Sequence, residues 1–296
     1  MGLIDDLTNT ASDILQPLIT NAPQSIAGED RYESVDVINL KNITQVYKDN
    51  GNVVKIFDNF SYDIKDIVGR GQFVTILGKS GCGKSTLLRY IAGLQTPTAG
   101  EVYIYGKLKT NKDRIPMVFQ QYSSFPWKTV LDNVALPLFL KGVNLQEAYE
   151  KAREIIKIVE LDGHEDKWAQ YPLLSGGQLQ RVAIARNLIA SPQILLMDEP
   201  FGALDIVTRN KMQETIIKIF SSATLDPTVI FVTHDISEAV FLSDTILILD
   251  ANPGRVAKQI KIKKPYPRTA EFKRTPEFNN YVTEIEDTMN FLNSKK

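Results

Sequence analysis

Short apolar runs recur along the chain and define its expected core. They occupy residues 73–77, 115–119, 194–197, 229–232 and 246–249. Strands buried on both faces of a parallel sheet have this nearly continuous hydrophobic character, and helical residues separate the last three runs from one another. The pattern therefore predicts an α/β fold with a mostly parallel sheet.

A different pattern precedes these runs. Apolar residues alternate with polar ones from Val35 to Tyr47, and Asn50-Gly51 separates this segment from residues 53–57. Asn-Gly between two strand-like runs is a strong signal for a β-hairpin. Residues 60–64 and 101–105 continue the series of short strands. We therefore expect a hairpin with further strands after it.

Helical periodicity dominates the middle of the chain. We expect one helix over residues 128–141 and another over 144–161. The second opens with an Asn144/Glu147 pair that resembles a capping box. These helices predict a helical insertion into the α/β core, over about residues 121–190.

Residues 1–34 form an N-terminal extension. Apolar residues recur at helical spacing over residues 3–18, and Pro17 and Pro23 break the pattern. The polar face carries aspartates but no lysine or arginine, so anionic lipid would repel it. This favours an amphipathic helix packed on its own domain or on a partner over one lying on a membrane. A frayed tail is a further alternative.

Composition narrows the function classes. The 296 residues are 43% hydrophobic and 23% charged, with a net charge of −1, so the basic excess typical of nucleic-acid binders is absent. No run is long enough to span a membrane, and no secretory signal is recognised. A single cysteine excludes an internal disulfide and fits a reducing compartment. We therefore expect a cytosolic protein that binds no nucleic acid.

The candidate chemistry centres on residues 78–85, which fit the pattern G-x-x-x-x-G-K-[ST]. A strand-like run precedes them, and a helical run that stops at Gly93 follows. A helix N-terminus offers unpaired N–H groups, and glycines let the backbone wrap around a phosphate. Lys84 would reach the terminal phosphates, and the Ser85 hydroxyl would complete a Mg²⁺ shell. This loop predicts binding of a nucleoside triphosphate.

Two carboxylates, Asp198 and Glu199, end the apolar run at 194–197. Ligands of open α/β sheets bind at the carboxyl ends of the strands. A strand-borne carboxylate beside a phosphate loop can hold Mg²⁺, which is the role expected for Asp198. Glu199 can polarise the attacking water.

A second candidate anion site is Leu174-Ser175-Gly176-Gly177-Gln178. Ser175 can cap a helix that starts at Gly176, and the glycines leave N–H groups unobstructed. Most such sequences are simply helix starts, so this pentapeptide becomes informative only together with the phosphate loop.

These motifs together make the chain resemble the ATP-binding subunit of ATP-binding-cassette (ABC) transporters. Six segments match that family in order: residues 78–86 (Walker A), Gln120 (Q-loop), 174–178 (signature), 194–199 (Walker B), 203–205 (D-loop) and 233–235 (H-loop). The resemblance covers about residues 36–250. It implies a P-loop NTPase core with a mostly parallel sheet, an antiparallel β-subdomain and the helical subdomain, over residues 35–260. A C-terminal tail over 261–296 would follow.

The resemblance also implies site residues. Tyr47 would stack on adenine, Gln120 would sense the metal and the attacking water, Glu199 would be the base, and His234 would contact the γ-phosphate. The metal would be held by Ser85, Gln120 and Asp198. The phosphates would be bound by Gly78, Ser80, Gly81, Cys82, Gly83, Lys84, Ser85 and Thr86.

In this family two subunits pair head to tail, identical or different. The resemblance therefore implies that Ser175, Gly176 and Gly177 cap the ATP of the partner subunit. Gln178 and Asp205 are also expected among the nucleotide-binding residues. Turnover would then require dimerisation, and motion of the dimer would drive transport.

Two looser matches suggest the kind of transporter. Residues 125–134, and in the tail residues 252–256, 267–268 and 274–278, resemble nitrate/sulfonate/taurine-type importers. This implies a peripheral subunit on the cytoplasmic face of the inner membrane, bound to permease subunits and served by a periplasmic or lipid-anchored solute-binding protein. Nitrate, bicarbonate, sulfonates and other small solutes stay open alternatives, as does an importer of another substrate class, because the binding protein and the membrane subunits carry the specificity. The N-terminal extension departs from the family pattern.

Three other function classes are disfavoured. A soluble ABC ATPase acting on DNA or ribosomes would have a long heptad insertion or two cassettes, and neither is found. In a GTPase, the aspartate of Asn111-Lys112-Asp113 would stand one residue later. A regulatory subunit without hydrolysis would not need Lys84, Asp198, Glu199 and His234 intact.

Several residues have weaker assignments. Tyr47 has the alternative of filling the hairpin, and Trp127 is either core or part of a partner-docking groove. His164 is interpreted as a loop residue, and Cys82 as a free position whose alkylation would block nucleotide. Arg181 and Arg186 are expected to form structural ion pairs.

Overall fold

The computed structural model describes residues 36–49, 52–67, 70–110, 112–121, 123–221, 227–251 and 253–294. The N-terminal extension and its expected amphipathic helix lie outside these residues. The subdomain boundaries predicted above stay predictions.

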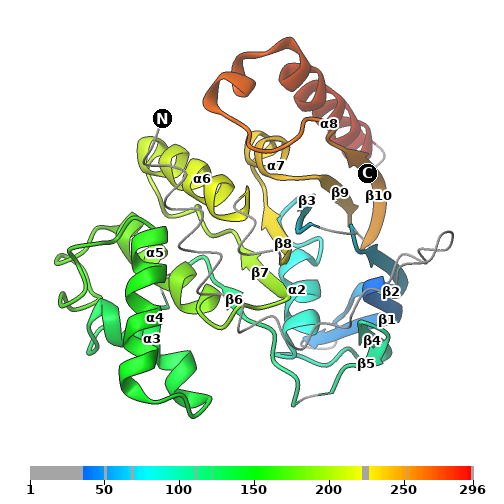
Figure 1. The fold of residues 1–296 in the computed structure, drawn as a ribbon. Coiled ribbons are helices and arrows are strands. Elements are labelled where there is room, and N and C mark those ends of the chain that lie inside the picture. The colour runs from blue at the N-terminus through cyan, green and yellow to red at the C-terminus, as the bar shows by residue number, and fades with distance from the viewer. Residues whose placement is uncertain are drawn as a thin grey trace, which may run out of the picture.

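A six-stranded sheet forms the centre of the molecule (Figure 1). Its order is β10 (Arg255–Lys261), β9 (Thr245–Asp250), β3 (Gln72–Gly78), β8 (Thr228–Thr233), β7 (Ile194–Asp198) and β6 (Met117–Val118). All neighbouring pairs are parallel except β9 with β10, which is antiparallel. The predicted mostly parallel sheet is therefore confirmed.

A second, antiparallel sheet has the order β2 (Asn52–Lys65), β1 (Asp36–Asp49), β4 (Ala99–Ile104) and β5 (Lys107–Leu108). The predicted hairpin is present, because Asp49 lies opposite Asn52. The predicted runs at 53–57 and 60–64 are one continuous strand rather than two. Between them Asn59 has a φ of 55°, and β1 pairs with β2 through several register shifts.

Three helices stand between β6 and β7: α3 (Val130–Leu140), α4 (Leu145–Ile158) and α5 (Gly176–Leu188). Figure 1 shows them grouped on the side of the molecule opposite the antiparallel sheet. Asn144 caps α4 as expected, because its side chain accepts a hydrogen bond from the Glu147 amide, and Thr129 caps α3 in the same way by accepting from the Asp132 amide.

The other helices are α2 (Lys84–Ala92), α6 (Ile206–Ser221), α7 (Ile236–Leu242), α8 (Pro276–Ser294) and a short 3₁₀ helix η2 (Ala270–Arg274). Among the described residues, no helix is both long and apolar enough to span a bilayer.

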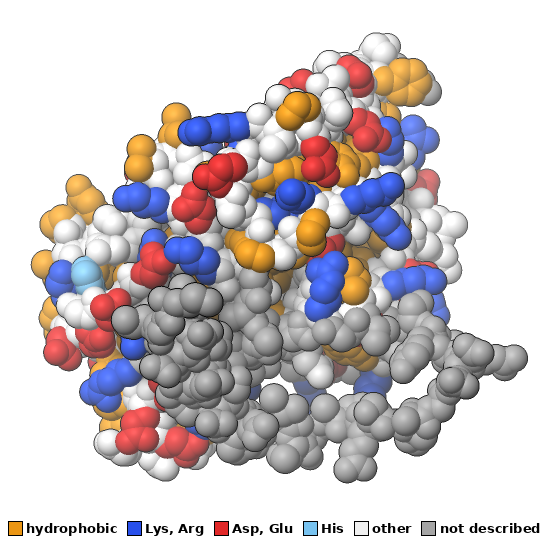
Figure 2. Space-filling view, turned by 45° about the horizontal axis from the view of Figure 1, so that its top comes forward, with side chains coloured by type: hydrophobic (Ala, Val, Ile, Leu, Met, Phe, Trp, Pro, Cys, Tyr) orange, Lys and Arg blue, Asp and Glu red, His pale blue; other side chains and the backbone are white. Residues whose placement is uncertain are grey.

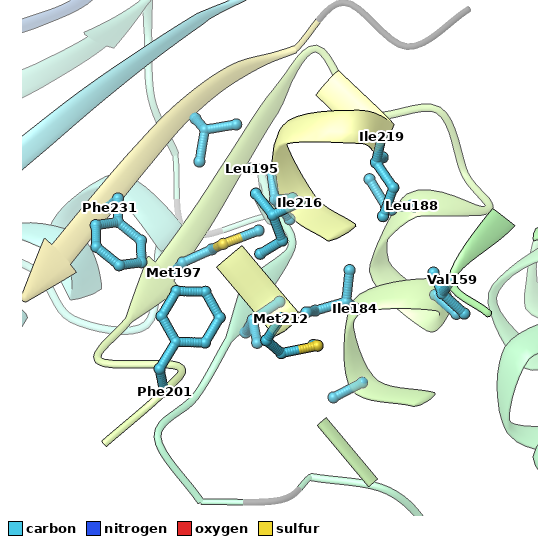
Figure 3. Close-up of a cluster of buried hydrophobic side chains, with 14 of the residues drawn as sticks. Val159, Ile184, Leu188, Leu195, Met197, Phe201, Met212, Ile216, Ile219 and Phe231 are labelled. Carbon is cyan, nitrogen blue, oxygen red and sulfur yellow. The ribbon is translucent and has the colours of Figure 1, made fainter. Parts of the chain in front are cut away.

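The core has one cluster on each face of the parallel sheet. Successive residues of β8 show this, because Val229 and Phe231 belong to one cluster while Ile230 and Val232 belong to the other. The first cluster includes α3–α8, and Figure 3 shows Met212 and Ile216 of α6 among side chains of β7 and α5. The second includes α2 and the antiparallel sheet. Sandwiching α2 in this way fixes the start of that helix at the sheet edge.

Candidate functional site

The phosphate loop joins β3 to α2 and depends on its glycines. Gly83 caps α2 with a φ of 101°, and a Cβ atom there would lie 2.4 Å from Cζ of Phe57. A Cβ atom on Gly78 would lie 2.7 Å from the Leu249 carbonyl oxygen. No other residue fits such positions without displacing its neighbours. The pattern of glycines is therefore required by backbone conformation and close packing.

Lys84 lies inside this loop. Its Nζ donates hydrogen bonds to the carbonyl oxygens of Gly78 at 2.8 Å and Lys79 at 2.9 Å, and the residue is only 6% exposed. The Lys84 ammonium thus lies inside the loop and is held by two of its carbonyl groups. The same donors would be available to phosphate oxygens in the loop.

Ser85 and Asp198 meet at the carboxyl edge of the sheet. The Ser85 hydroxyl, in the first turn of α2, donates to Oδ1 of Asp198 at 2.9 Å. Burial raises the pKa of the Asp198 carboxyl above its usual value, which makes its charged form costly. A cation beside these two oxygens would favour that charged form, so this pair suits Mg²⁺.

Glu199 and His234 lie at the ends of neighbouring strands. The Glu199 amide donates to the Val232 carbonyl at 2.9 Å, and its Oε2 lies 3.1 Å from Nδ1 of His234. The His234 side chain is 66% exposed, so the imidazole stands at the rim of the site. Glu199 has a φ of 46°, unusual for a residue with a side chain, and such strain is often found at functional sites.

Gln120 lies beside the turn that follows Glu199. A Cβ atom built on Gly202 would be 3.1 Å from Nε2 of Gln120, and the Gly202 amide donates to the Glu199 carbonyl at 3.1 Å. Its expected role as a sensor stays a prediction.

Tyr47 is 41% exposed on β1, and its hydroxyl accepts a hydrogen bond from Nε2 of Gln95 at 2.9 Å. The ring therefore does not fill the interior of the hairpin. Stacking on adenine stays a prediction.

The signature residues Ser175 and Gln178 form hydrogen bonds with each other. Ser175 caps α5 by accepting from the Gln178 amide, and the Gln178 side chain accepts from the Ser175 amide at 2.9 Å. Gly177 packs against α6, since a Cβ atom there would lie 2.4 Å from Cγ2 of Thr208. Among the described residues, no hydrogen bond joins residues 175–178 to residues 78–86. The two predicted anion sites are thus separately built within one chain.

Asp205 caps α6. Its Oδ1 accepts from the amides of Val207 and Thr208, each at 3.0 Å. The pKa of the Asp205 carboxyl is below its usual value, mainly because of the hydrogen bonds that it accepts from Thr208. A contact with nucleotide stays a prediction.

The structure corrects some of the weaker assignments. Cys82, at a free position of the loop pattern, is 1% exposed within the core cluster, and burial raises the pKa of its thiol. The effect of its alkylation stays a prediction. Trp127 is 67% exposed, which rules out a core position. Arg181 forms the expected ion pair, with Glu160 at 2.9 Å.

Arg186 forms no ion pair with any described residue. It donates to the Ser123 hydroxyl at 2.9 Å and lies 5.1 Å from the centre of the Phe125 ring. His164 is a loop residue as expected, but its Nε2 lies 2.8 Å from Nε2 of Gln178, so it supports the signature.

Sequence reasoning missed the residues behind His234, above all Glu238. Asp235 caps α7 by accepting from the Glu238 amide, and the Glu238 side chain is almost fully buried beneath the site. The spacing Asp235-x-x-Glu238 is a helix-start signal that would have drawn attention to it.

Comparison with known proteins gives a consistent result. Residues 61–202 match the ABC transporter family. An aliphatic sulfonates import ATP-binding protein of Bacillus cereus is 41% identical over 233 residues, which cover 78% of this chain and 88% of that protein. A nitrate import ATP-binding protein of Synechocystis sp. is 44% identical over 223 residues, covering 73% and 82%.

Among solved structures, an ATP-binding cassette in a dimeric post-hydrolysis state with bound ADP and Pi is 35% identical, with a TM-score of 0.63. That match covers 77% of this chain and all of the other.

Proposed function

Because the chain belongs to the ABC transporter family and is an ATPase, we propose that it energises the import of a small solute through a separate membrane permease. The observation that carries this proposal is the pairing of Ser85 with Asp198 and of Glu199 with His234 at the ends of β7 and β8. One pair suits a metal ion, and the other suits activation of water.

The phosphate loop would bind ATP through its amides and the Lys84 ammonium. The amides are those of Gly78, Ser80, Gly81, Cys82, Gly83 and Thr86. Ser85 and Asp198, with Gln120, would hold Mg²⁺. The ion would neutralise part of the negative charge of the phosphates. No group of three or more His, Cys, Asp or Glu among the described residues could hold a metal by itself, so phosphate oxygens would complete the shell.

Glu199 would accept the proton of the attacking water, because its carboxylate follows Asp198 at the end of β7 and lies beside His234. His234 would donate a hydrogen bond to the γ-phosphate from the rim of the site and, through its 3.1 Å approach to Glu199, orient that base. Phosphoryl transfer is limited mainly by positioning and charge stabilisation, which these fixed groups would provide.

We place the signature residues Ser175, Gly176 and Gly177, supported by Gln178, on the ATP of a second subunit, with Asp205 near the same interface. The capping box occupies the amides of Ser175 and Gln178, so the amides of Gly176 and Gly177 are the ones that would bind the anion. The dimeric state of the solved cassette supports this arrangement. Whether the second subunit is a copy of this chain is left to experiment.

The solute is proposed to be a sulfonate, nitrate or bicarbonate, because the relatives compared above import sulfonates and nitrate. The chain would sit peripherally on the cytoplasmic face of the inner membrane, bound to permease subunits and served indirectly by a solute-binding protein. We propose no nucleic-acid partner. In Figure 2, acidic and basic side chains alternate over the coloured part of the face, and the net charge is −1.

The test is to purify the chain with its permease and measure ATPase activity with solute-binding protein loaded in turn with nitrate, bicarbonate, taurine or an alkanesulfonate. We expect one of them to raise the ATPase rate, with unloaded binding protein as control. Stimulation by none would overturn the solute class while leaving ATP hydrolysis intact.

A further inference from the structure

The turn that carries His234 is closed by its own hydrogen bonds. The Thr233 hydroxyl accepts from the Asp235 amide at 3.0 Å, and the Asp235 side chain accepts from the Glu238 amide at 3.0 Å. His234 therefore stands between two residues that are both tied to the first turn of α7. Its backbone position depends on what holds that turn.

Glu238 holds the turn from beneath. Its Oε2 accepts from the Thr233 hydroxyl at 2.7 Å and its Oε1 from Nε2 of Gln213 on α6 at 3.3 Å. The residue is 5% exposed, so its carboxylate has exchanged water for these partners. A buried carboxylate with few partners is sensitive to the loss of any one of them.

Arg209 links the same group to the D-loop. Its Nη2 donates to the Leu204 carbonyl at 3.1 Å, and its guanidinium lies 3.8 Å from carboxylate oxygens of both Asp235 and Glu238. The loop before α6 and the turn before α7 thus share one cation. A displacement of the D-loop would therefore change the ion pairs that hold the turn before α7, and the reverse also holds.

The C-terminal segment completes this network. Nζ of Lys273 in η2 donates to Oε1 of Gln213 at 2.7 Å and to Oδ1 of Asn210 at 2.9 Å, and it lies 4.4 Å from the centre of the Phe241 ring of α7. Donation by Lys273 fixes the orientation of the Gln213 amide, because the amide oxygen must face the ammonium. The NH₂ group of Gln213 then faces Glu238.

We propose that Glu238 is a positioning residue that holds His234 against Glu199, and that Lys273 anchors it through Gln213. Lys273, in the C-terminal tail to which the sequence assigned no part in catalysis, thereby supports the position of His234. The proposal deepens the function proposed above, because it assumes that His234 acts at the γ-phosphate. Its effect runs through His234 rather than through contact with ATP.

The chain offers a direct readout, since it contains two histidines only, His164 and His234. Histidine labelled with ¹³C at Cε1 should give two imidazole signals, assigned with the variant H164N. In K273M and E238Q we expect the His234 signal to shift or broaden while that of His164 stays in place. K258M is the matched control, because Lys258 forms a C-terminal ion pair with Glu284 at 2.9 Å outside this network.

Kinetics supply the second readout. We expect K273M to lower kcat by about tenfold while KM and Kd for ATP change less than about twofold, because a group held slightly out of place loses turnover before binding. K273R should restore most of the rate, since it keeps the cation over Phe241. K258M should leave both constants and both imidazole signals unchanged.

Two results would overturn the proposal: an unmoved His234 signal in both K273M and E238Q with cooperative thermal unfolding retained, or equal effects of K258M and K273M. The imidazole signals do not depend on activity. A fully active H234A variant would therefore refute the proposed role of His234 without deciding whether Glu238 and Lys273 position it.

Discussion

The two anion sites of this chain are built in opposite ways. At the edge of the parallel sheet, the phosphate loop, Asp198, Glu199 and His234 come from distant segments and bind one another. At the start of α5, Ser175 and Gln178 form the cap by bonding each other, and His164 and Thr208 only support it from outside. One site is a tertiary assembly, whereas the other is a local helix cap.

This difference suggests what each site requires. At the sheet edge, one subunit holds the Asp198 carboxyl, the candidate base Glu199 and the Lys84 ammonium in place. Substitutions there should therefore act on hydrolysis. At the cap, the side chains of Ser175 and Gln178 are hydrogen-bonded to each other's amides, and the proposed ATP would come from a second subunit, so substitutions there should act on association. The predictions below separate these effects.

The largest expected effect is at the sheet edge. Glu199→Gln should lower ATP turnover by at least ~10²-fold through loss of the base, with ATP binding intact. ATP-bound dimer should accumulate because hydrolysis no longer separates it. Single-turnover hydrolysis and gel filtration with ATP measure both outcomes. Normal turnover would remove Glu199 from the mechanism.

The proposed contact between the Ser175 cap and ATP can be tested by adding a negative charge at residue 175 without changing the stability of the fold. Asn and Asp are both good N-caps, so Ser175→Asn and Ser175→Asp should retain thermal stability within about 0.5 kcal/mol. Only the aspartate would repel phosphate. In an E199Q background we expect S175N to keep ATP-dependent dimerisation and S175D to lose it. Equal dimerisation of the two variants would argue against a signature contact with ATP.

Packing behind the cap should give a moderate effect. Gly177→Ala places a methyl group against Cγ2 of Thr208, so we expect a loss of about 1 kcal/mol in the free energy of unfolding. Thr208→Ser removes that methyl group and should restore most of the loss in the double variant. Additive losses in urea unfolding would show that the contact is not responsible.

The smallest expected effect is a gain in stability at the sheet edge. Burial raises the pKa of Asp198, so its ionised form is disfavoured in the folded protein at neutral pH. Asp198→Asn keeps an acceptor for Ser85 and removes the charge. The melting temperature without nucleotide should rise by about 2 °C, while Mg²⁺-dependent hydrolysis is lost.

The sign of this effect is open to a second check by pH. Wild-type Asp198 becomes protonated as pH falls through its raised pKa, and the stability penalty disappears. The difference between D198N and wild type should therefore shrink toward acid pH. A difference that grows on acidification would contradict the assignment.

Local chemistry was predictable from the sequence. The glycine loop between strand and helix, the caps at Asn144 and Ser175 and the hairpin between β1 and β2 each depend on residues close together in the chain. Their hydrogen bonds and periodicity are set within a few residues, so the pattern alone identifies them.

Only the tertiary structure decided which distant groups meet. Cys82 occupies a variable position of the loop pattern yet is buried, and Arg186 lies over Phe125 and forms no ion pair within the described part of the chain. Lys273 reaches Glu238 through Gln213, across three elements that follow no common spacing. Such contacts depend on how faces of helices and strands pack, and a single sequence does not specify that packing residue by residue. The sequence by itself identified the candidate residues of the two anion sites, whereas the fold decided which distant side chains meet there and what packs behind them.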